Sequence, residues 1–234
     1  MSRPDPAAVT PRVPTARQVE GGRRFGRVLL GALWRCEAHH RERVPAGPVV
    51  LVANHSGFLD GPLVFSLAPR GVSFLVKQQM FTGPLGRVLR TVGQIPIDRS
   101  RGDRSALGVA RAVLERGGAV GVFPEGTRGR GDVAQVNQGA AWLALQAGAQ
   151  VVPVAVLGTR RAGASTGSLP RVRTRVVVDF GEPFDLAPDR ALPGRERLRA
   201  ATERLRDRLA EHVTTASATY GLVLPDDGLV EAGD

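Results

Sequence analysis

The sequence predicts a single α/β domain in which helices flank a mainly parallel central sheet. Short apolar runs, such as Val49–Ala53 and Val151–Leu157, alternate along the chain with segments of helical spacing. The runs are apolar at consecutive positions, which is typical of strands covered by helices on both faces. A chain of 234 residues, 42% of them hydrophobic, is long enough for one such domain and short for two.

The chain divides into four segments. Residues 1–18 carry several prolines and are expected to form a loose arm, and residues 19–43 are expected to form a helix. Residues 44–215 hold the alternating strands and helices of the main domain. The acidic residues 216–234 are expected to fray.

The helix expected over residues 19–43 has two apolar surfaces. One stripe consists of Phe25, Val28, Leu29, Ala32, Leu33 and Cys36, and a second spot of Leu30 and Trp34 lies off it. In one interpretation the stripe packs the helix onto the core. In the other, the helix lies on a membrane surface, with Trp34 and its arginines at the level of the lipid headgroups.

The main domain is expected to contain six strands and five helices. Strands are predicted at Val49–Ala53, Val72–Val76, Gln94–Ile97, Ala119–Phe123, Val151–Leu157 and Arg171–Phe180. The last of these is expected to be half-exposed, because apolar and basic residues alternate along it. Helices are predicted at Leu59–Leu67, Leu85–Val92, Asp103 (as the cap) to Arg116, Gln138–Ala147 and Arg195–Val213. Sites in parallel sheets form at the carboxyl ends of strands, so we expect the chemistry in the loops after Ala53, Ile97 and Phe123.

The net charge of +10 comes almost entirely from arginine, because Lys77 is the only lysine. Arginine binds phosphate through a planar fork, so an anionic partner is one explanation, and an arginine-rich genome is another for the preference over lysine. A nucleic-acid partner is not expected, because aromatic residues are few and no nucleic-acid-binding motif is present.

Cysteine usage and hydropathy bound the setting in which the chain works. Cys36 is the only cysteine, which excludes an internal disulfide and a thiolate metal cluster and favours a reducing compartment. The N-terminal stretch has no secretory signal pattern, and no window approaches the roughly 18 apolar residues needed to cross a bilayer.

A histidine and an aspartate follow the first expected strand, in Asn54-His55-Ser56-Gly57-Phe58-Leu59-Asp60. If the turn folds back, the Asp60 carboxylate can hold one ring nitrogen of His55 and leave the other free to accept a proton. No serine nucleophile is required, because a substrate hydroxyl can take that part. The spacing alone is common, so its meaning depends on the rest of the chain.

Three further blocks follow: Gly93-Gln94-Ile95-Pro96-Ile97-Asp98-Arg99, Phe123-Pro124-Glu125-Gly126-Thr127-Arg128 and Val152-Pro153-Val154. In this order and spacing, the four blocks resemble the glycerolipid acyltransferase family, of the lysophosphatidate acyltransferase type. The resemblance runs from about Pro48 to Pro183 and implies the fold of that family. Two positions depart from its common form: Gly57 stands in place of a serine, and Gln138 in place of a frequent lysine.

The resemblance implies a role for each matching residue. His55 would be the base toward the acceptor hydroxyl, and Asp60 would orient it. Positions that bind the acceptor's glycerol phosphate in the family match Arg99, Glu125, Gly126, Thr127 and Arg128, and Pro153 would shape the pocket. The residue types suit this chemistry, because arginines pair with phosphate and a glycine lets the backbone approach closely.

The implied reaction moves a fatty acyl group from acyl-CoA or acyl-carrier protein to a lysophospholipid, 1-acylglycerol-3-phosphate above all, giving phosphatidic acid. No acyl-enzyme is expected, because no cysteine or serine sits beside a base in a nucleophile turn. The implied reaction also calls for no metal and no cofactor. A two-chain product belongs in a bilayer, so we expect a cytoplasmic protein, peripheral at the inner face of the cell membrane. Its candidate contacts are helix 19–43 and the basic segment from Arg70 to Gly131.

Two alternatives stay open beside this reaction. One is a catalytically silent lipid-phosphate binding protein of the same fold, and the other is an acyltransferase for a different acceptor. The remaining histidines, His39, His40 and His212, lie outside the four blocks and are expected to be solvated.

Overall fold

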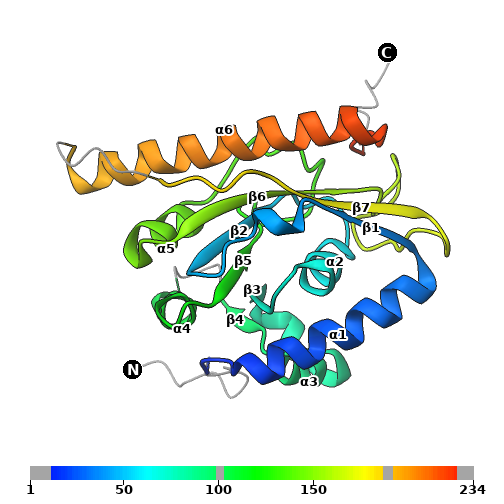
Figure 1. Ribbon diagram of the computed structural model, residues 1–234, viewed down its shortest axis with the longest axis horizontal. Helices are drawn as coiled ribbons and strands as arrows, with labels where there is room; N and C mark the ends of the chain where they lie inside the picture. Colours follow the sequence, from blue (N-terminus) through cyan, green and yellow to red (C-terminus); the bar gives the residue numbers. More distant parts are fainter. Residues whose placement is uncertain (1–11, 99–102, 187–191, 226–234) are drawn as a thin grey trace, which may run out of the picture.

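A computed structural model describes residues 12–98, 103–186 and 192–225. Its strands are β1 Arg35–His39, β2 Val49–Ala53, β3 Val72–Lys77, β4 Ile95–Ile97, β5 Ala119–Val122, β6 Gln150–Leu157 and β7 Arg175–Phe180. They form one sheet in the order β1-β7-β6-β2-β5-β3-β4, shown in Figure 1. Every described pair is parallel except β6 with β7, so the prediction of a mainly parallel sheet is confirmed.

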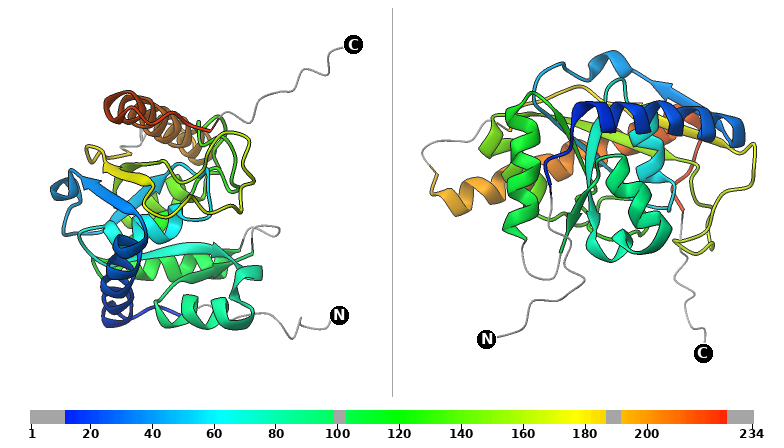
Figure 2. Two further views of the ribbon diagram at one scale, coloured as in Figure 1. Left: turned by 90° about the vertical axis from the view of Figure 1, so that its right-hand side faces the viewer. Right: turned by 90° about the horizontal axis from the view of Figure 1, so that it is seen from below.

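Helices cover both faces of this sheet. They are α1 Ala16–Leu33, α2 Asp60–Leu67, α3 Gly83–Thr91, α4 Arg104–Glu115, α5 Gly139–Ala147 and α6 Gly194–Tyr220, with short 3-10 turns η1 Arg41–Arg43 and η2 Gln78–Phe81. The helices α1 and α2 pack on one face and α4, α5 and α6 on the other, as Figures 1 and 2 show from three sides.

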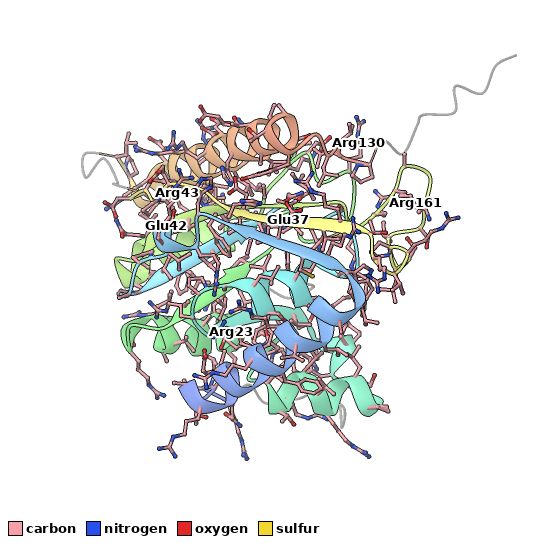
Figure 3. All side chains as sticks on the ribbon, turned by 45° about the vertical axis from the view of Figure 1, so that its right-hand side comes forward. Arg23, Glu37, Glu42, Arg43, Arg130 and Arg161 are labelled. Atoms are coloured by element: carbon pink, nitrogen blue, oxygen red, sulfur yellow. The ribbon has the colours of Figure 1, made fainter. Side chains whose placement is uncertain are left out.

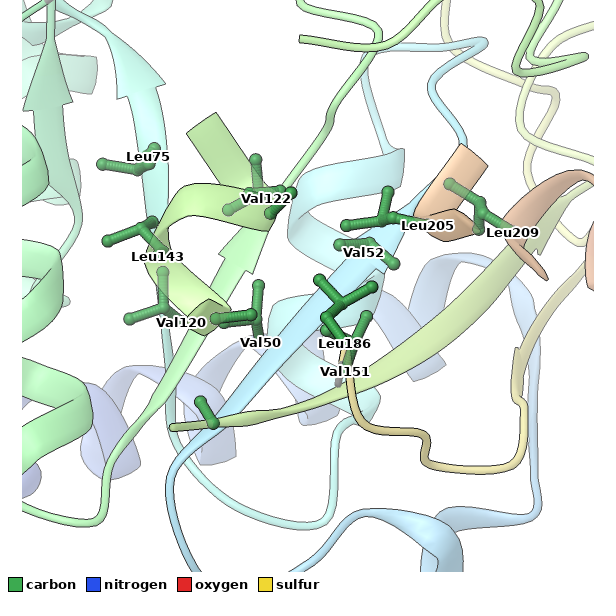
Figure 4. Packing of buried hydrophobic residues seen from close by; sticks show 14 of the residues in the cluster. Val50, Val52, Leu75, Val120, Val122, Leu143, Val151, Leu186, Leu205 and Leu209 are labelled. Atoms are coloured by element: carbon green, nitrogen blue, oxygen red, sulfur yellow. The ribbon is translucent and has the colours of Figure 1, made fainter. Parts of the chain in front are cut away.

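The central strand β2 explains why the apolar runs are continuous. All five of its residues are buried. Val50 and Val52 point into the cluster formed with α5 and α6 (Figure 4), whereas Val49 and Leu51 point into the cluster formed with α1 and α2. Because side chains alternate between faces, a strand covered on both sides needs an apolar residue at every position.

The first helix is shorter than predicted. α1 ends at Leu33, and Trp34 turns to extended backbone with φ −127° and ψ 157°. The residues predicted to continue the helix instead form η1 and the edge strand β1, which pairs with β7. Trp34 is buried, and its Nε1 donates to the carbonyl oxygen of Pro170 at 3.2 Å. Strand pairing and this anchor override the helical spacing of the segment.

The apolar stripe of α1 faces away from the core. Phe25, Val28 and Leu29 are 70%, 76% and 48% exposed, whereas Leu30 and Trp34 are buried. Of the stripe, Leu33 and Cys36 pack partly against the core, so the interpretation in which the stripe packs onto the core is wrong for Phe25, Val28 and Leu29. The placement of Trp34 at the level of the headgroups is also wrong. The second spot of Leu30 and Trp34 packs onto the core instead, because helical spacing identifies an apolar surface but not what that surface faces.

The carboxyl-terminal elements also differ from expectation. β7 begins at Arg175 and is buried at five of its six positions rather than half-exposed, because β1 and β6 flank it on both sides. α6 continues past Val213 to Tyr220, so residues 216–220 are helical rather than frayed. Residues 16–18 likewise belong to α1, which Thr15 caps, while residues 1–11 and 226–234 lie outside the described part.

The histidines outside the four blocks are not simply solvated. The His212 side chain is only 13% exposed, and its Nε2 donates to the carbonyl oxygen of Asp179 at 3.0 Å. Burial lowers the pKa of His212. His40 Nδ1 lies 2.7 Å from Asp179 Oδ1, and the His39 ring stacks on Tyr220. These contacts join α6 to the β1–β7 edge of the sheet.

Candidate functional site

The turn between β2 and α2 brings His55 and Asp60 together. His55 comes two residues after the end of β2, and Asp60 is the first residue of α2. His55 Nδ1 lies 2.9 Å from Asp60 Oδ2, with the His55 side chain 12% exposed and that of Asp60 fully buried. Nε2 of His55 makes no hydrogen bond to any described residue. The turn folds back, which is the condition that the sequence set for this pair to meet.

The buried Asp60 carboxylate is held by four donors. Oδ2 accepts from the backbone N–H groups of Ser56 and Gly57 at 2.7 and 2.8 Å, besides His55. Oδ1 accepts from the Thr159 hydroxyl at 2.5 Å. A buried carboxylate is costly unless its oxygens are paired, and these bonds fix its orientation toward the imidazole. Gly57 suits this turn, because a Cβ there would lie 3.1 Å from Thr159 Oγ1.

Asn54 lets the chain leave the sheet just before His55. Its side-chain amide accepts from the Val156 N–H at 2.7 Å and donates to the Val156 carbonyl oxygen at 3.1 Å. The side chain therefore continues the hydrogen bonding between β2 and β6 while the backbone turns away. Asn54 is fully buried, so both polar ends of the amide need these partners.

The loop after β5 wraps around the other side of His55. The His55 ring stacks on Phe123 with centroids 4.1 Å apart, and its backbone N–H donates to Glu125 Oε1 at 2.7 Å. Burial raises the pKa of Glu125 to about 7, with smaller contributions from Asp132 and Asp60. Glu125 can therefore carry or release a proton near neutral pH. The carbonyl oxygen of His55 accepts from the Gly129 N–H at 2.9 Å, which closes the loop over the turn.

The predicted phosphate-binding residues of this loop lie beside the pair. Gly126 has φ +79°, a conformation that favours glycine, and a Cβ there would lie 2.6 Å from Asn137 Nδ2. Thr127 is exposed, and the Arg128 guanidinium lies over the Phe58 ring at 5.1 Å from its centroid. The structure thus gathers Glu125 to Arg128 with His55 and Asp60 at the carboxyl ends of β2 and β5.

Two predicted positions stand apart from this group. Arg99 lies outside the described residues. Pro153 is buried inside β6, in register with Val52, and its ring packs next to Gly181 after β7. Pro153 thus belongs to the sheet interior beneath the site, and a direct role at the pocket stays a prediction.

Sequence reasoning missed the loop after β6. Thr159 reaches Asp60, and Arg160, also buried, donates to the carbonyl oxygens of Ser56, Ala164 and Gly129 at 2.7, 2.8 and 2.8 Å. Arg160 thereby fastens the His55 turn to the loop after β5. One signal in the sequence could have identified this loop. β6 is parallel to β2, so its carboxyl end lies at the same edge of the sheet as those of β2 and β5. The rule that sites form at the carboxyl ends of parallel strands therefore applies to the loop after β6 as well.

The arrangement supplies a positioned base in a polar surrounding. A carboxylate on Nδ1 fixes the tautomer of His55 and stabilises the imidazolium, so Nε2 can take a proton from a bound hydroxyl. Among the described residues, no group of three or more His, Cys, Asp or Glu side chains gathers as metal ligands.

Comparisons with known proteins point to one family. The family described as Acyltransferase matches residues 35–157, which include the His55, Glu125 and Pro153 blocks. A 1-acyl-sn-glycerol-3-phosphate acyltransferase of Bacillus subtilis is 30% identical over 188 residues, covering 79% of this chain and 92% of the relative. A lyso-ornithine lipid O-acyltransferase of Pseudomonas aeruginosa is 36% identical over 129 residues, covering 54% of this chain and 49% of that protein.

A solved structure has the same fold. The crystal structure of the 1-acyl-sn-glycerophosphate acyltransferase PlsC of Thermotoga maritima superposes with a TM-score of 0.63 at 24% identity, covering 84% of this chain and 79% of that one. The family match covers more than half of the chain, and the Bacillus relative is matched over nearly its whole length. The chain therefore belongs to the acyltransferase family.

Proposed function

We propose that this chain is a 1-acylglycerol-3-phosphate O-acyltransferase, which moves a fatty acyl group from a thioester to lysophosphatidate and gives phosphatidic acid. The proposal rests on the geometry around His55. Asp60 holds its Nδ1 at 2.9 Å, and its Nε2 makes no hydrogen bond to a described residue. The loop that bears Arg128 lies beside it. Relatives named for this reaction support it, including the Bacillus subtilis protein.

The proposed reaction needs no cofactor beyond the acyl-CoA or acyl-carrier protein donor. Nε2 of His55 takes the proton of the acceptor hydroxyl as its oxygen attacks the thioester carbonyl carbon. The C–S bond breaks, the thiolate leaves, and the imidazolium returns the proton to sulfur. The products are an ester and a free thiol. Asp60 stabilises the imidazolium while it exists, and Thr159 holds Asp60.

Thr159→Val tests this supporting hydroxyl, because valine keeps the shape and removes the donor. A hydrogen bond to a charged group contributes roughly 1.5–3 kcal/mol, so we expect kcat to fall about ten- to a hundredfold while both KM values change little. Thr159→Ser restores a hydroxyl and should recover most of kcat. Unchanged kcat in a folded Thr159→Val protein would show that Asp60 needs no support from β6.

Arg128→Ala tests the phosphate assignment. If Arg128 binds the acceptor phosphate, we expect the KM for lysophosphatidate to rise about ten- to a hundredfold with little change in the KM for the thioester, since charged hydrogen bonds of this kind contribute roughly 1.5–3 kcal/mol. Arg204→Ala on the exposed face of α6 is the matched control and should change neither KM. An equal rise for both substrates would contradict the assignment.

We further propose that the chain works as a peripheral protein at the cytoplasmic face of the cell membrane. Among the described residues, no helix is both long and apolar enough to cross a bilayer. Exposed apolar residues occur on α1 and α3, which both lie at the lower side of the molecule in Figure 1. They are Phe25, Val28, Leu29, Leu85 and Val88. A surface of this kind suits the interface of a membrane better than water.

The deciding experiment offers the protein a panel of acceptors and weighs the products by mass spectrometry. Lysophosphatidate, lyso-ornithine lipid, other lysophospholipids and glycerol phosphate are each combined with acyl-CoA or acyl-carrier protein. We expect phosphatidic acid, and thiol release that depends on lysophosphatidate. Release only with lyso-ornithine lipid would move the acceptor to that of the Pseudomonas relative. Lipid binding without release would make the chain a silent binding protein.

A further inference from the structure

We propose that the loop joining β6 to β7, residues 158–174, is a second lipid-contact surface that binds anionic phospholipid headgroups. We call it the β6–β7 loop. The inference rests on the proposed function only in that the chain works at a bilayer. The β6–β7 loop is distinct from α1 and from the basic segment between Arg70 and Gly131.

The β6–β7 loop is strongly basic. It carries four arginines and no aspartate or glutamate. Arg160 is buried and engaged in the site, whereas Arg161, Arg171 and Arg173 are exposed. None of these three forms an ion pair with a described residue. Figure 3 shows Arg161 standing out from this loop, at the opposite edge of the molecule from Arg43. Exposed arginines free of acidic neighbours suit lipid phosphates.

Large apolar side chains are interleaved with these arginines. Leu169 and Val172 are 56% and 63% exposed, and Val172 stands between Arg171 and Arg173. A purely electrostatic surface does not need them, but a bilayer interface accepts apolar groups below the phosphates and cations at their level.

The loop continues the exposed stripe of α1. The Arg173 N–H donates to the Leu33 carbonyl oxygen at 2.7 Å, and Trp34 Nε1 donates to Pro170. In Figures 1 and 2 the loop lies beside the carboxyl end of α1, the helix that exposes Val28 and Leu29. The loop and the carboxyl end of α1 are therefore adjacent on the surface of the protein.

The backbone of the loop is held in a demanding shape. Arg173 has φ +65°, a conformation that favours glycine, yet an arginine occupies it. Such strain persists only where surrounding contacts impose it, and here the bond to Leu33 does so.

The loop also begins at the site. Its second and third residues are Thr159 and Arg160, which hold Asp60 and the carbonyl oxygen of Ser56. Arg161 is therefore next in the chain to two residues that hold the groups around His55, so a bilayer that contacts Arg161 lies close to the site.

An acidic acyl-carrier protein is a rival occupant, because it too would attract arginines. Two observations favour the lipid surface: the apolar Leu169 and Val172, and the continuity with the exposed stripe of α1. The experiment separates the two occupants.

The test compares three double variants of the full chain by co-sedimentation with vesicles of phosphatidylglycerol and phosphatidylcholine, and of phosphatidylcholine alone. Arg171→Ala with Arg173→Ala is matched by Arg195→Ala with Arg204→Ala, two exposed arginines on α6 across the molecule. Leu169→Ser with Val172→Ser tests the apolar part. Each cation near an anionic leaflet gives about fivefold in binding, so the loop arginine variant should bind anionic vesicles about 30-fold less at low salt.

The α6 control should bind anionic vesicles as the unchanged protein does, and the serine variant should lose the part of binding that salt does not remove. Wild-type binding by both loop variants would overturn the proposal. So would unchanged vesicle binding together with a raised KM for acyl-carrier protein alone, which would assign the loop to the donor. Vesicle binding needs no turnover, so an inactive protein that still showed these losses would refute the proposed function and leave the loop assignment standing.

Discussion

Replacing His55 by alanine is expected to lower kcat/KM for acyl transfer by at least about 10²–10⁴-fold, the usual contribution of a positioned general base. The loss follows from the geometry, because the fully buried Asp60 carboxylate holds His55 Nδ1 at the carboxyl end of β2 and leaves Nε2 without a hydrogen bond to any described residue. Thiol release from acyl-CoA in the presence of lysophosphatidate measures the rate. The His55 side chain is mostly buried, at 12% exposed, but Asp60 keeps its other three donors, so only a modest loss of heat stability is expected.

The control for His55→Ala is a measurement of fold and lipid binding in the same sample. Circular dichroism and the melting temperature should stay close to those of the unchanged protein, and vesicle binding should persist. The stacking contact with Phe123 is lost, so a small shift in Tm is acceptable. Near-normal turnover in the folded variant would sink the proposed mechanism.

Asp60→Asn is expected to reduce kcat almost as much, by about 10²–10⁴-fold, although it changes few atoms. The amide oxygen can still accept from Ser56 and Gly57, and the amide nitrogen can face the Thr159 hydroxyl, which can accept. The turn therefore keeps its donors, but the negative charge that stabilises the His55 imidazolium is gone. Asp60→Asn therefore tests the negative charge of Asp60 while its hydrogen-bond geometry stays in place.

The outcome for Asp60→Asn is read from kcat with both KM values and the melting curve beside it. A loss confined to kcat in a folded protein supports the role of the charge. If Asp60→Asn kept most of kcat while Thr159→Val lost it, orientation rather than charge would be the contribution of Asp60. A variant that fails to fold is replaced by Asp60→Glu, which keeps the charge and shifts its position.

The fold was predictable wherever burial is decided by the sheet itself. The bounds of β2 and the pattern of β6 could be read from consecutive apolar residues, because strands covered on both faces are apolar whatever their partner is. β1 was not predictable, because residues 35–39 have helical spacing and become a strand only through pairing with β7, far along the chain. The face that α1 buries was also undetermined, since Leu30 and Val28 lie on different sides of one helix and both are apolar.

The site divides in the same way. His55, Asp60 and Glu125 belong to short local motifs, and the turn that joins the pair spans five residues. Thr159 stands 99 residues from Asp60, and a threonine after a strand has no local pattern that marks it. Arg160 looked like one more arginine in a basic chain, and only its burial and its three carbonyl partners distinguish it.

The joint between α1 and the sheet has a consequence for how lipid reaches the site. Trp34 is the only residue between α1 and β1, and it is anchored in the protein. A domain on a flexible linker tumbles above a surface and visits it at intervals. A domain joined to its membrane-binding helix through one fixed residue keeps a single orientation. His55 would therefore stay at a constant height above a bilayer that receives α1. Under that condition the acceptor arrives by lateral diffusion, and the rate follows its mole fraction in the membrane rather than its concentration in the bulk solution.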